Sequence, residues 1–176
     1  MLKKMLMLLG MGLALAGCSQ VDVQHYRGES PTLELREYFE GRTEAWGMFQ
    51  KRSGEVVKRF HVVINGHSEG ERLILDEEFT YSDGTTDKRV WTLTPQGEGR
   101  WQGTAGDVVG VAQGEVAGNA FHWRYVLRLP VDGKVYEVHM DDWMYLIDGQ
   151  TLVNRTAMSK FGVELGQVTV FFRKQP

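Results

Sequence analysis

The sequence predicts an all-β protein, an antiparallel up-and-down β-barrel of about ten strands with one short helix ahead of them. From Thr43 onward, apolar and polar side chains alternate with a period of two, which is typical of strands and not of helices. Glycine-containing turns interrupt these runs at strand-like intervals. Because closure removes exposed sheet edges, this many antiparallel strands favour a barrel, with a β-sandwich as the alternative.

The first 17 residues have the shape of a signal peptide. Lys3 and Lys4 precede an apolar run over residues 5–16, which is shorter than the about 20 residues that a helix needs to cross a bilayer. The run ends in Leu-Ala-Gly-Cys at residues 15–18, which resembles the lipobox of bacterial lipoproteins, and Cys18 is the sole cysteine. We expect cleavage before Cys18 and lipid on its sulfur; the alternative is a secreted protein with one unpaired thiol.

The resemblance to lipoproteins also implies a location. In that pathway, a residue other than aspartate after the lipidated cysteine directs the protein to the outer membrane, and Ser19 follows Cys18. We therefore expect a lipid anchor on the periplasmic face of the outer membrane, a lipidated tether over residues 18–28, and a single barrel domain over residues 29–176. The formal net charge of −3 argues against a nucleic-acid partner.

A short helix is expected between the tether and the first strand. Ser30 suits an N-cap and Pro31 suits the first helical position. Three apolar residues of this segment share one helical face: Leu35, Tyr38 and Phe39. The helix is therefore expected to lie against a mouth of the barrel.

Asp132-Gly133 is a two-residue hairpin signal, and such a turn fixes the register of the strands beside it. The register places Arg128 opposite Glu137 on the polar face. On the apolar face it places Leu129, Leu127 and Tyr125 opposite Tyr136, Val138 and Met140. Charge meets charge and apolar meets apolar, which supports this register.

A second hairpin signal, Asp148-Gly149, read as a two-residue turn, places Asp142 opposite Arg155. The first hairpin places Asp142 on the apolar face, opposite Trp123. A carboxylate there is unfavourable unless it is paired. Two interpretations follow: an internal ion pair of the core, or a polar anchor for the head group of a ligand in an apolar interior.

Residues 66–70, Gly-His-Ser-Glu-Gly, match the G-x-S-x-G elbow of serine hydrolases. The elbow requires a helix directly after its strand, whereas residues 71–75 have the pattern of another strand. We therefore expect a polar hairpin loop opened by Asn65-Gly66. A serine esterase that uses Ser68 is a remote alternative.

No metal site is expected. The predicted register sets His122 opposite Trp143, about four residues and roughly 13 Å from His139, too far apart to bind one ion. Neighbouring carboxylates at 76–78 and 141–142 point to opposite faces of their strands. No cofactor signature is present either.

Five tryptophans, six tyrosines and eight phenylalanines suit either a packed aromatic core or a partly hollow barrel that holds a small ligand, as lipocalins do. Trp46 on the first long strand and Arg173 on the last are expected to stack where the barrel closes. This contact is similar to that of a tryptophan and a basic residue in calycin barrels. The lipocalin Gly-x-Trp motif is absent, because Ala45-Trp46-Gly47 stands in its place.

Several short segments are together similar to a family of bacterial lipoproteins known as domain of unknown function 3833. They are EAWGMFQ at 44–50, YSDG at 81–84, WRY at 123–125, LPVDG at 129–133, DDWMY at 141–145 and MSKFG at 158–162. The resemblance covers nearly the whole mature chain. It implies a lipoprotein with a calycin-like barrel and brings no activity, cofactor or catalytic residue.

Three hypotheses about function follow. The first is a non-enzymatic binder or carrier of a lipid-like or amphipathic small molecule. Its expected ligand contacts are Trp46, Trp123, Tyr125, Met140, Asp142 and Arg155. The second is an envelope interaction protein with a packed barrel and an unknown protein partner, and the third is the esterase that uses Ser68.

Overall fold

The computed structural model describes residues 21–176. The expected signal peptide over residues 1–17 and the lipid attachment site at Cys18 lie outside the described residues. Within residues 21–176, no helix is long and apolar enough to cross a membrane.

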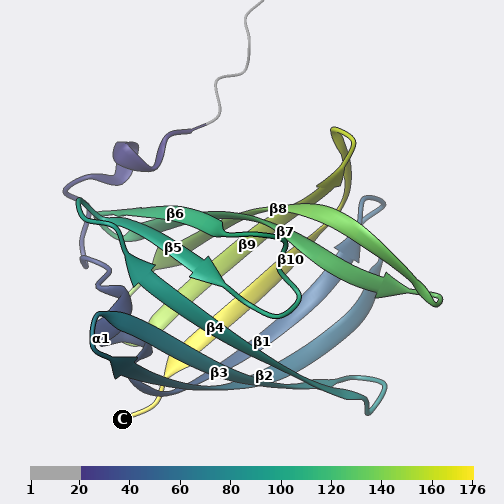
Figure 1. The fold of residues 1–176 in the computed structure, drawn as a ribbon, viewed down its shortest axis with the longest axis horizontal. Coiled ribbons are helices and arrows are strands. Elements are labelled where there is room, and N and C mark those ends of the chain that lie inside the picture. Colours follow the sequence, from purple (N-terminus) through teal and green to yellow (C-terminus); the bar gives the residue numbers. More distant parts are fainter. Residues whose placement is uncertain (1–20) are drawn as a thin grey trace, which may run out of the picture.

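Ten antiparallel strands form one closed barrel, and β1 pairs with β10 to complete it (Figure 1). Each of the strands from β2 to β9 pairs with the strand before it and the strand after it in the chain. The predicted up-and-down barrel is therefore confirmed, and the sandwich is excluded. The strands are β1 Gly41–Lys51, β2 Val56–Glu69, β3 Arg72–Tyr81, β4 Thr86–Pro95, β5 Arg100–Thr104, β6 Ala112–Ala117, β7 Ala120–Val131, β8 Lys134–Leu146, β9 Thr151–Lys160 and β10 Val163–Lys174.

The β7–β8 hairpin has the predicted register. Arg128 lies opposite Glu137, and Asp142 lies opposite Trp123. Asp132 and Gly133 both have positive φ, at 50° and 74°, as the central residues of a type I′ turn require. The turn residues alone were therefore sufficient to predict which side chains of β7 and β8 face the interior.

The β8–β9 hairpin differs from its prediction by one residue. Asp142 lies opposite Thr156, and Arg155 lies opposite Trp143 and points outward, so the predicted Asp142–Arg155 ion pair is wrong. The loop contains residues 148–150 because two backbone N–H groups at its end donate to the Asp148 carboxylate at 2.8 and 2.7 Å. This side-chain contact stabilises a loop wider than a two-residue turn.

Helix α1, Leu35–Phe39, closes one end of the barrel, at the left of Figure 1. Its expected apolar face is buried, but it begins later than expected, and the Ser30–Pro31 peptide bond, which is cis, precedes it in the chain. Gly66 allows the close approach of α1, because a Cβ atom there would overlap the carbonyl oxygen of Phe39. Lys174 Nζ donates to the carbonyl oxygens of Tyr38 and Glu40 at 2.9 and 2.6 Å, which attaches the end of the helix to β10.

A 3-10 turn, η1 Val23–Tyr26, packs against the outside of β6 and β7. Val23 is buried, and the Tyr26 ring meets Trp143 and Tyr145 edge-on at 6.1 and 5.3 Å. Residues within the expected tether are thus packed on the barrel. The packed chain begins by Val23, ahead of the expected start at Glu29.

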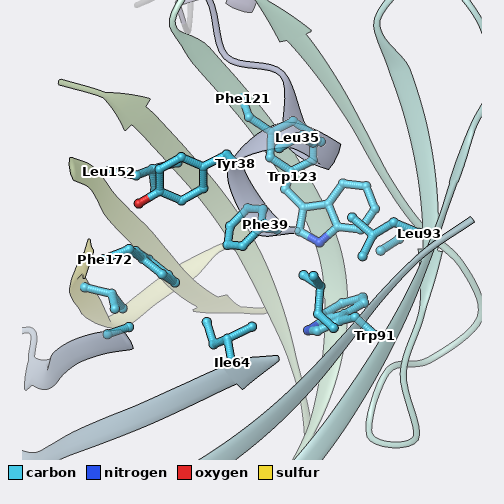
Figure 2. Close-up of a cluster of buried hydrophobic side chains, with 14 of the residues drawn as sticks. Leu35, Tyr38, Phe39, Ile64, Trp91, Leu93, Phe121, Trp123, Leu152 and Phe172 are labelled. Carbon is cyan, nitrogen blue, oxygen red and sulfur yellow. The ribbon is translucent and has the colours of Figure 1, made fainter. Parts of the chain in front are cut away.

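Aromatic and aliphatic side chains fill the part of the barrel next to α1 (Figure 2). Trp91 meets Trp123 edge-on, with ring centroids 5.8 Å apart. Gly103 of β5 leaves room for the Trp123 indole, since a Cβ there would lie 2.7 Å from the ring. The packed end of the barrel is therefore a dense aromatic layer.

Candidate ligand-binding site

A cavity of about 520 Å³ occupies the interior beyond this aromatic layer. It lies within the range of about 300–1,000 Å³ that small-molecule sites span. Its apolar lining next to α1 includes Leu35, Phe39, Ile64, Leu93, Phe121 and Phe172. At the opposite end its lining includes Lys58, Thr85 and Arg128, which lie near the tips of the β1–β2, β3–β4 and β7–β8 hairpins and are partly or fully exposed. We call this end the mouth.

Three charged side chains form a cluster on the cavity wall. Arg89 on β4 donates from Nε and Nη2 to the Asp107 carboxylate at 3.0 and 2.6 Å, and its Nη1 lies 3.8 Å from Glu77 Oε2 on β3. Asp107 belongs to the segment between β5 and β6, so the ion pair ties this segment to β4. Burial raises the pKa of Glu77 to about 7, although the Arg89 charge opposes that shift.

Asp142 on β8 lies in the same cavity, separately from this cluster. Its residue is only 5% exposed, and the Asn154 side-chain amide donates to its carboxylate. Asn154 in turn accepts a hydrogen bond from the Thr156 hydroxyl at 3.2 Å. Burial raises the pKa of Asp142 to about 7, with the Asn154 and Thr156 hydrogen bonds opposing. Within residues 21–176, no ion pair compensates this carboxylate. The predicted position of Asp142 on the apolar face, opposite Trp123, is confirmed.

Trp123, Tyr125 and Met140 line the cavity, as the predicted register requires. Tyr125 meets Trp91 edge-on, with ring centroids 5.3 Å apart. Burial raises the pKa of Tyr125, and the Asp142 charge adds to the shift. Trp123 and Tyr125 thus place aromatic surface on β7, the strand that pairs with β8 at the buried carboxylate.

Trp46 does not line the cavity. It is 44% exposed and packs on the outer wall against His61 and Phe171, at ring-centroid distances of 5.3 and 6.4 Å. Its partner across the closure is Phe171, so the predicted stacking on Arg173 is wrong. Along β1, the inward-facing neighbours of Trp46 are Ala45 and Gly47, so strand alternation directs the Trp46 side chain outward.

Arg155, the other expected ligand contact outside the cavity, is exposed on β9. Its Nε donates to the Gln167 side chain at 3.0 Å on the outer wall. Its outward direction follows from the one-residue difference in the β8–β9 register. Arg89 is instead an arginine that lines the cavity wall.

Sequence reasoning did not find the cluster of Glu77, Arg89 and Asp107. A signal existed for two of its members, because Glu77 has the same parity as Leu75 on β3 and Arg89 has the same parity as Trp91 on β4. Asp107 lies between strands, where side-chain direction has no period.

Ser68 is exposed near the end of β2, beside the segment that follows α1. Its hydroxyl donates to Glu40 at 2.8 Å. Residues 65–69 extend β2, so the expected hairpin loop at Asn65-Gly66 is wrong, and β3 follows after a turn at Gly70. The helix that a nucleophile elbow needs is absent from this part of the described chain.

His122 lies opposite Trp143, as predicted. The two rings stack with centroids 3.9 Å apart, and His122 Nε2 lies 2.6 Å from Asp141 Oδ1. Among residues 21–176, no group of three or more histidine, cysteine, aspartate or glutamate side chains is placed to bind a metal ion.

A closed antiparallel barrel with one plugged end and an internal cavity places the protein among the calycin-like barrels. The chain belongs to the family described as protein of unknown function, DUF3833, whose family model matches residues 12–174. No curated protein matches the chain.

Among solved structures, the barrel is similar to an S-type phycobiliprotein lyase, CPES, from Guillardia theta. The TM-score is 0.56, and the match covers 82% of this chain and 94% of the lyase chain at 7% sequence identity. At this identity the similarity establishes the shared fold.

Proposed function

We propose that this protein is a non-enzymatic binder or carrier of an amphipathic small molecule held inside the barrel. The observation that carries the proposal is the cavity of about 520 Å³, whose largely apolar lining also carries a few charged side chains on its wall and at its mouth. Such a lining suits a molecule with an apolar body and one polar end. The fold shared with a phycobiliprotein lyase is compatible with a barrel that receives a ligand.

The polar groups of the cavity favour binding over catalysis. Arg89 is engaged by Asp107 and Glu77, and Asp142 is held by Asn154. In the described part of the chain, neither a serine nor a histidine lines the cavity, so it holds no pair of hydroxyl nucleophile and imidazole base.

A matched pair of tryptophan substitutions tests the proposal. Val168→Trp adds an indole to a cavity-lining position, whereas Val90→Trp adds the same group to an exposed outer position. The probe is N-phenylnaphthylamine, an uncharged amphipathic molecule whose fluorescence rises in apolar surroundings. We expect saturable binding to the wild type and to Val90→Trp, and at least about a tenfold loss of affinity with Val168→Trp. The added indole would occupy cavity space and remove apolar contacts with the probe that contribute more than about 1 kcal/mol to binding. Equal binding to both variants would show that the probe does not enter the barrel.

We also propose that lipid on Cys18 holds the barrel on the periplasmic face of the outer membrane. The lipobox-like residues 15–18 and the single cysteine support this proposal. Val23 packs near Ala117 and Ala120, next to the end of the barrel that α1 closes. A chain of five residues spans at most about 17 Å, so the anchor would attach close to the plugged end and leave the mouth directed away from the lipid.

Metabolic labelling with a radioactive fatty acid, followed by membrane fractionation, tests the anchor. We expect label on the wild type in the outer-membrane fraction and no label on Cys18→Ala. An unlabelled wild type, or a Cys18→Ala variant that still takes up the label, would contradict the lipid anchor.

A further inference from the structure

The inner part of the cavity carries more carboxylates than cations. Glu77, Asp107 and Asp142 face it, and Arg89 is the arginine that accompanies them there. At the mouth, Lys58 Nζ pairs with Asp83 at 3.2 Å and lies 4.1 Å from the centre of the Tyr81 ring. The charges that a bound molecule meets below the mouth are therefore predominantly negative.

The Arg89 guanidinium is already bound by carboxylates. Two of its nitrogens donate to Asp107, and its third lies 3.8 Å from Glu77. An anionic head group would have to displace one of these carboxylates from its cation, which is most unfavourable for Glu77, whose side chain is largely buried. Arg89 is thus poorly placed to select a fatty acid or a phosphate.

Asp142 has the opposite character. Its hydrogen-bond donor, the Asn154 amide, is neutral, and no ion pair within residues 21–176 includes it. It lines the cavity, and its cross-strand neighbour is Trp123. A buried carboxylate without a cation is costly, and aromatic rings beside it can contribute attraction for an organic cation.

We infer that the ligand of this cavity is an amphipathic amine whose ammonium group pairs with Asp142 and whose apolar body lies against the aromatic wall formed by Trp91, Trp123 and Tyr125. The inference rests on the proposed function, because it names the ligand class of the same cavity. The raised pKa of Asp142, about 7, fits a carboxylate that lacks its cation while the cavity is empty. An ammonium group that enters the cavity would favour the ionised form.

Three probes with the same alkyl chain and different head groups test the inference: decylammonium, decanol and decanoate. Binding to the full chain carrying Cys18→Ala, which needs no detergent, is measured by calorimetry at about pH 8, where the ionised form of Asp142 is favoured. We expect decylammonium to bind at least about tenfold more tightly than either other probe, as expected for a hydrogen bond to a buried charged group. Asp142→Asn should reduce decylammonium affinity to that of decanol and change decanol affinity by less than about twofold.

Glu137→Gln is the matched control, because it removes one negative charge from the exposed face of the same strand, β8. It should leave all three affinities unchanged. The comparison of head groups on the unsubstituted cavity needs no substitution at Asp142, so it stands even where Asp142→Asn fails to fold.

The outcomes separate the two claims. Equal affinity for the three probes, tightest binding of decanoate, or an amine preference that survives in Asp142→Asn would overturn the assignment of an amine while leaving the barrel a binder. Failure of all three probes to bind would overturn both claims.

Discussion

Replacing Asp142 with asparagine should stabilise the protein above neutral pH and leave its stability nearly unchanged in acid. The Asp142 carboxyl is buried on the cavity wall, and burial raises its pKa from 3.8 to about 7. The pKa of this carboxyl is higher in the folded protein than in the unfolded chain. The protonated Asp142 carboxyl therefore stabilises the folded protein fully below pH 3.8, and this stabilisation is lost as the pH rises toward 7. Each pH unit in that window lowers the free energy of unfolding by 1.36 kcal/mol, so the wild type loses up to about 4 kcal/mol.

Asparagine carries no charge to bury and can still accept the hydrogen bond of Asn154 through its own Oδ1. The weaker, neutral hydrogen bond reduces the gain by about 1 kcal/mol. Glu77, whose pKa is also raised to about 7, titrates in the same window in both proteins. The prediction therefore concerns the difference between variant and wild type, in which the Glu77 contribution largely cancels.

Urea denaturation followed by tryptophan fluorescence at about pH 4, 6 and 8 measures this difference. We expect Asp142→Asn to exceed the wild type by about 2–4 kcal/mol at the highest pH, with the excess shrinking toward the lowest. A variant that is less stable than the wild type at about pH 8, or a difference that does not depend on pH, would refute the reasoning. Either result would mean that a cation compensates the Asp142 carboxylate in the folded protein.

Three further substitutions have defined outcomes. Gly103→Ala should lower the free energy of unfolding by about 1–3 kcal/mol because its Cβ would meet the Trp123 ring, whereas Gly149→Ala, with open space around it, should change little in the same denaturation measurement. Arg89→Met should destabilise the protein by on the order of 3 kcal/mol at neutral pH, since it leaves the largely buried Glu77 and the partly exposed Asp107 without their cation. Urea curves in acid should show a smaller loss, and an equal loss at both pH values would contradict this reasoning. Ser68→Ala should leave the turnover of chromogenic esters at the wild-type level, and a loss of turnover would revive the esterase hypothesis.

The sequence was most informative where a tight turn set the register. Asp132-Gly133 has the backbone geometry of a two-residue turn, so counting from it placed Trp123, Tyr125 and Asp142 on the interior face. The same counting failed after Asp148, because its carboxylate accepts two backbone N–H groups and widens the loop. The dipeptide alone does not distinguish these two loops.

The remaining differences have a steric and a topological origin. Trp46 was expected to stack on Arg173 where the barrel closes and to contact ligand, as its likeness to the calycin contact implied. On β1 the interior position next to it is Gly47, over which the Phe60 ring lies. The Arg89–Asp107 pair joins a strand to an irregular segment, a contact that no periodic pattern encodes. Local patterns therefore predicted the barrel and one side of its cavity, while the charged cluster required the folded chain.

Native mass spectrometry of the Cys18→Ala protein, exported to a bacterial periplasm and purified without detergent, tests the central claim most directly. The same sample after extraction with organic solvent is the comparison. We predict a discrete mass above that of the polypeptide, which extraction removes and which Val168→Trp fails to retain while Val90→Trp retains it. A bare polypeptide mass in the untreated sample, together with no uptake of added amphipathic probes, would contradict the account of the barrel as a ligand-binding protein.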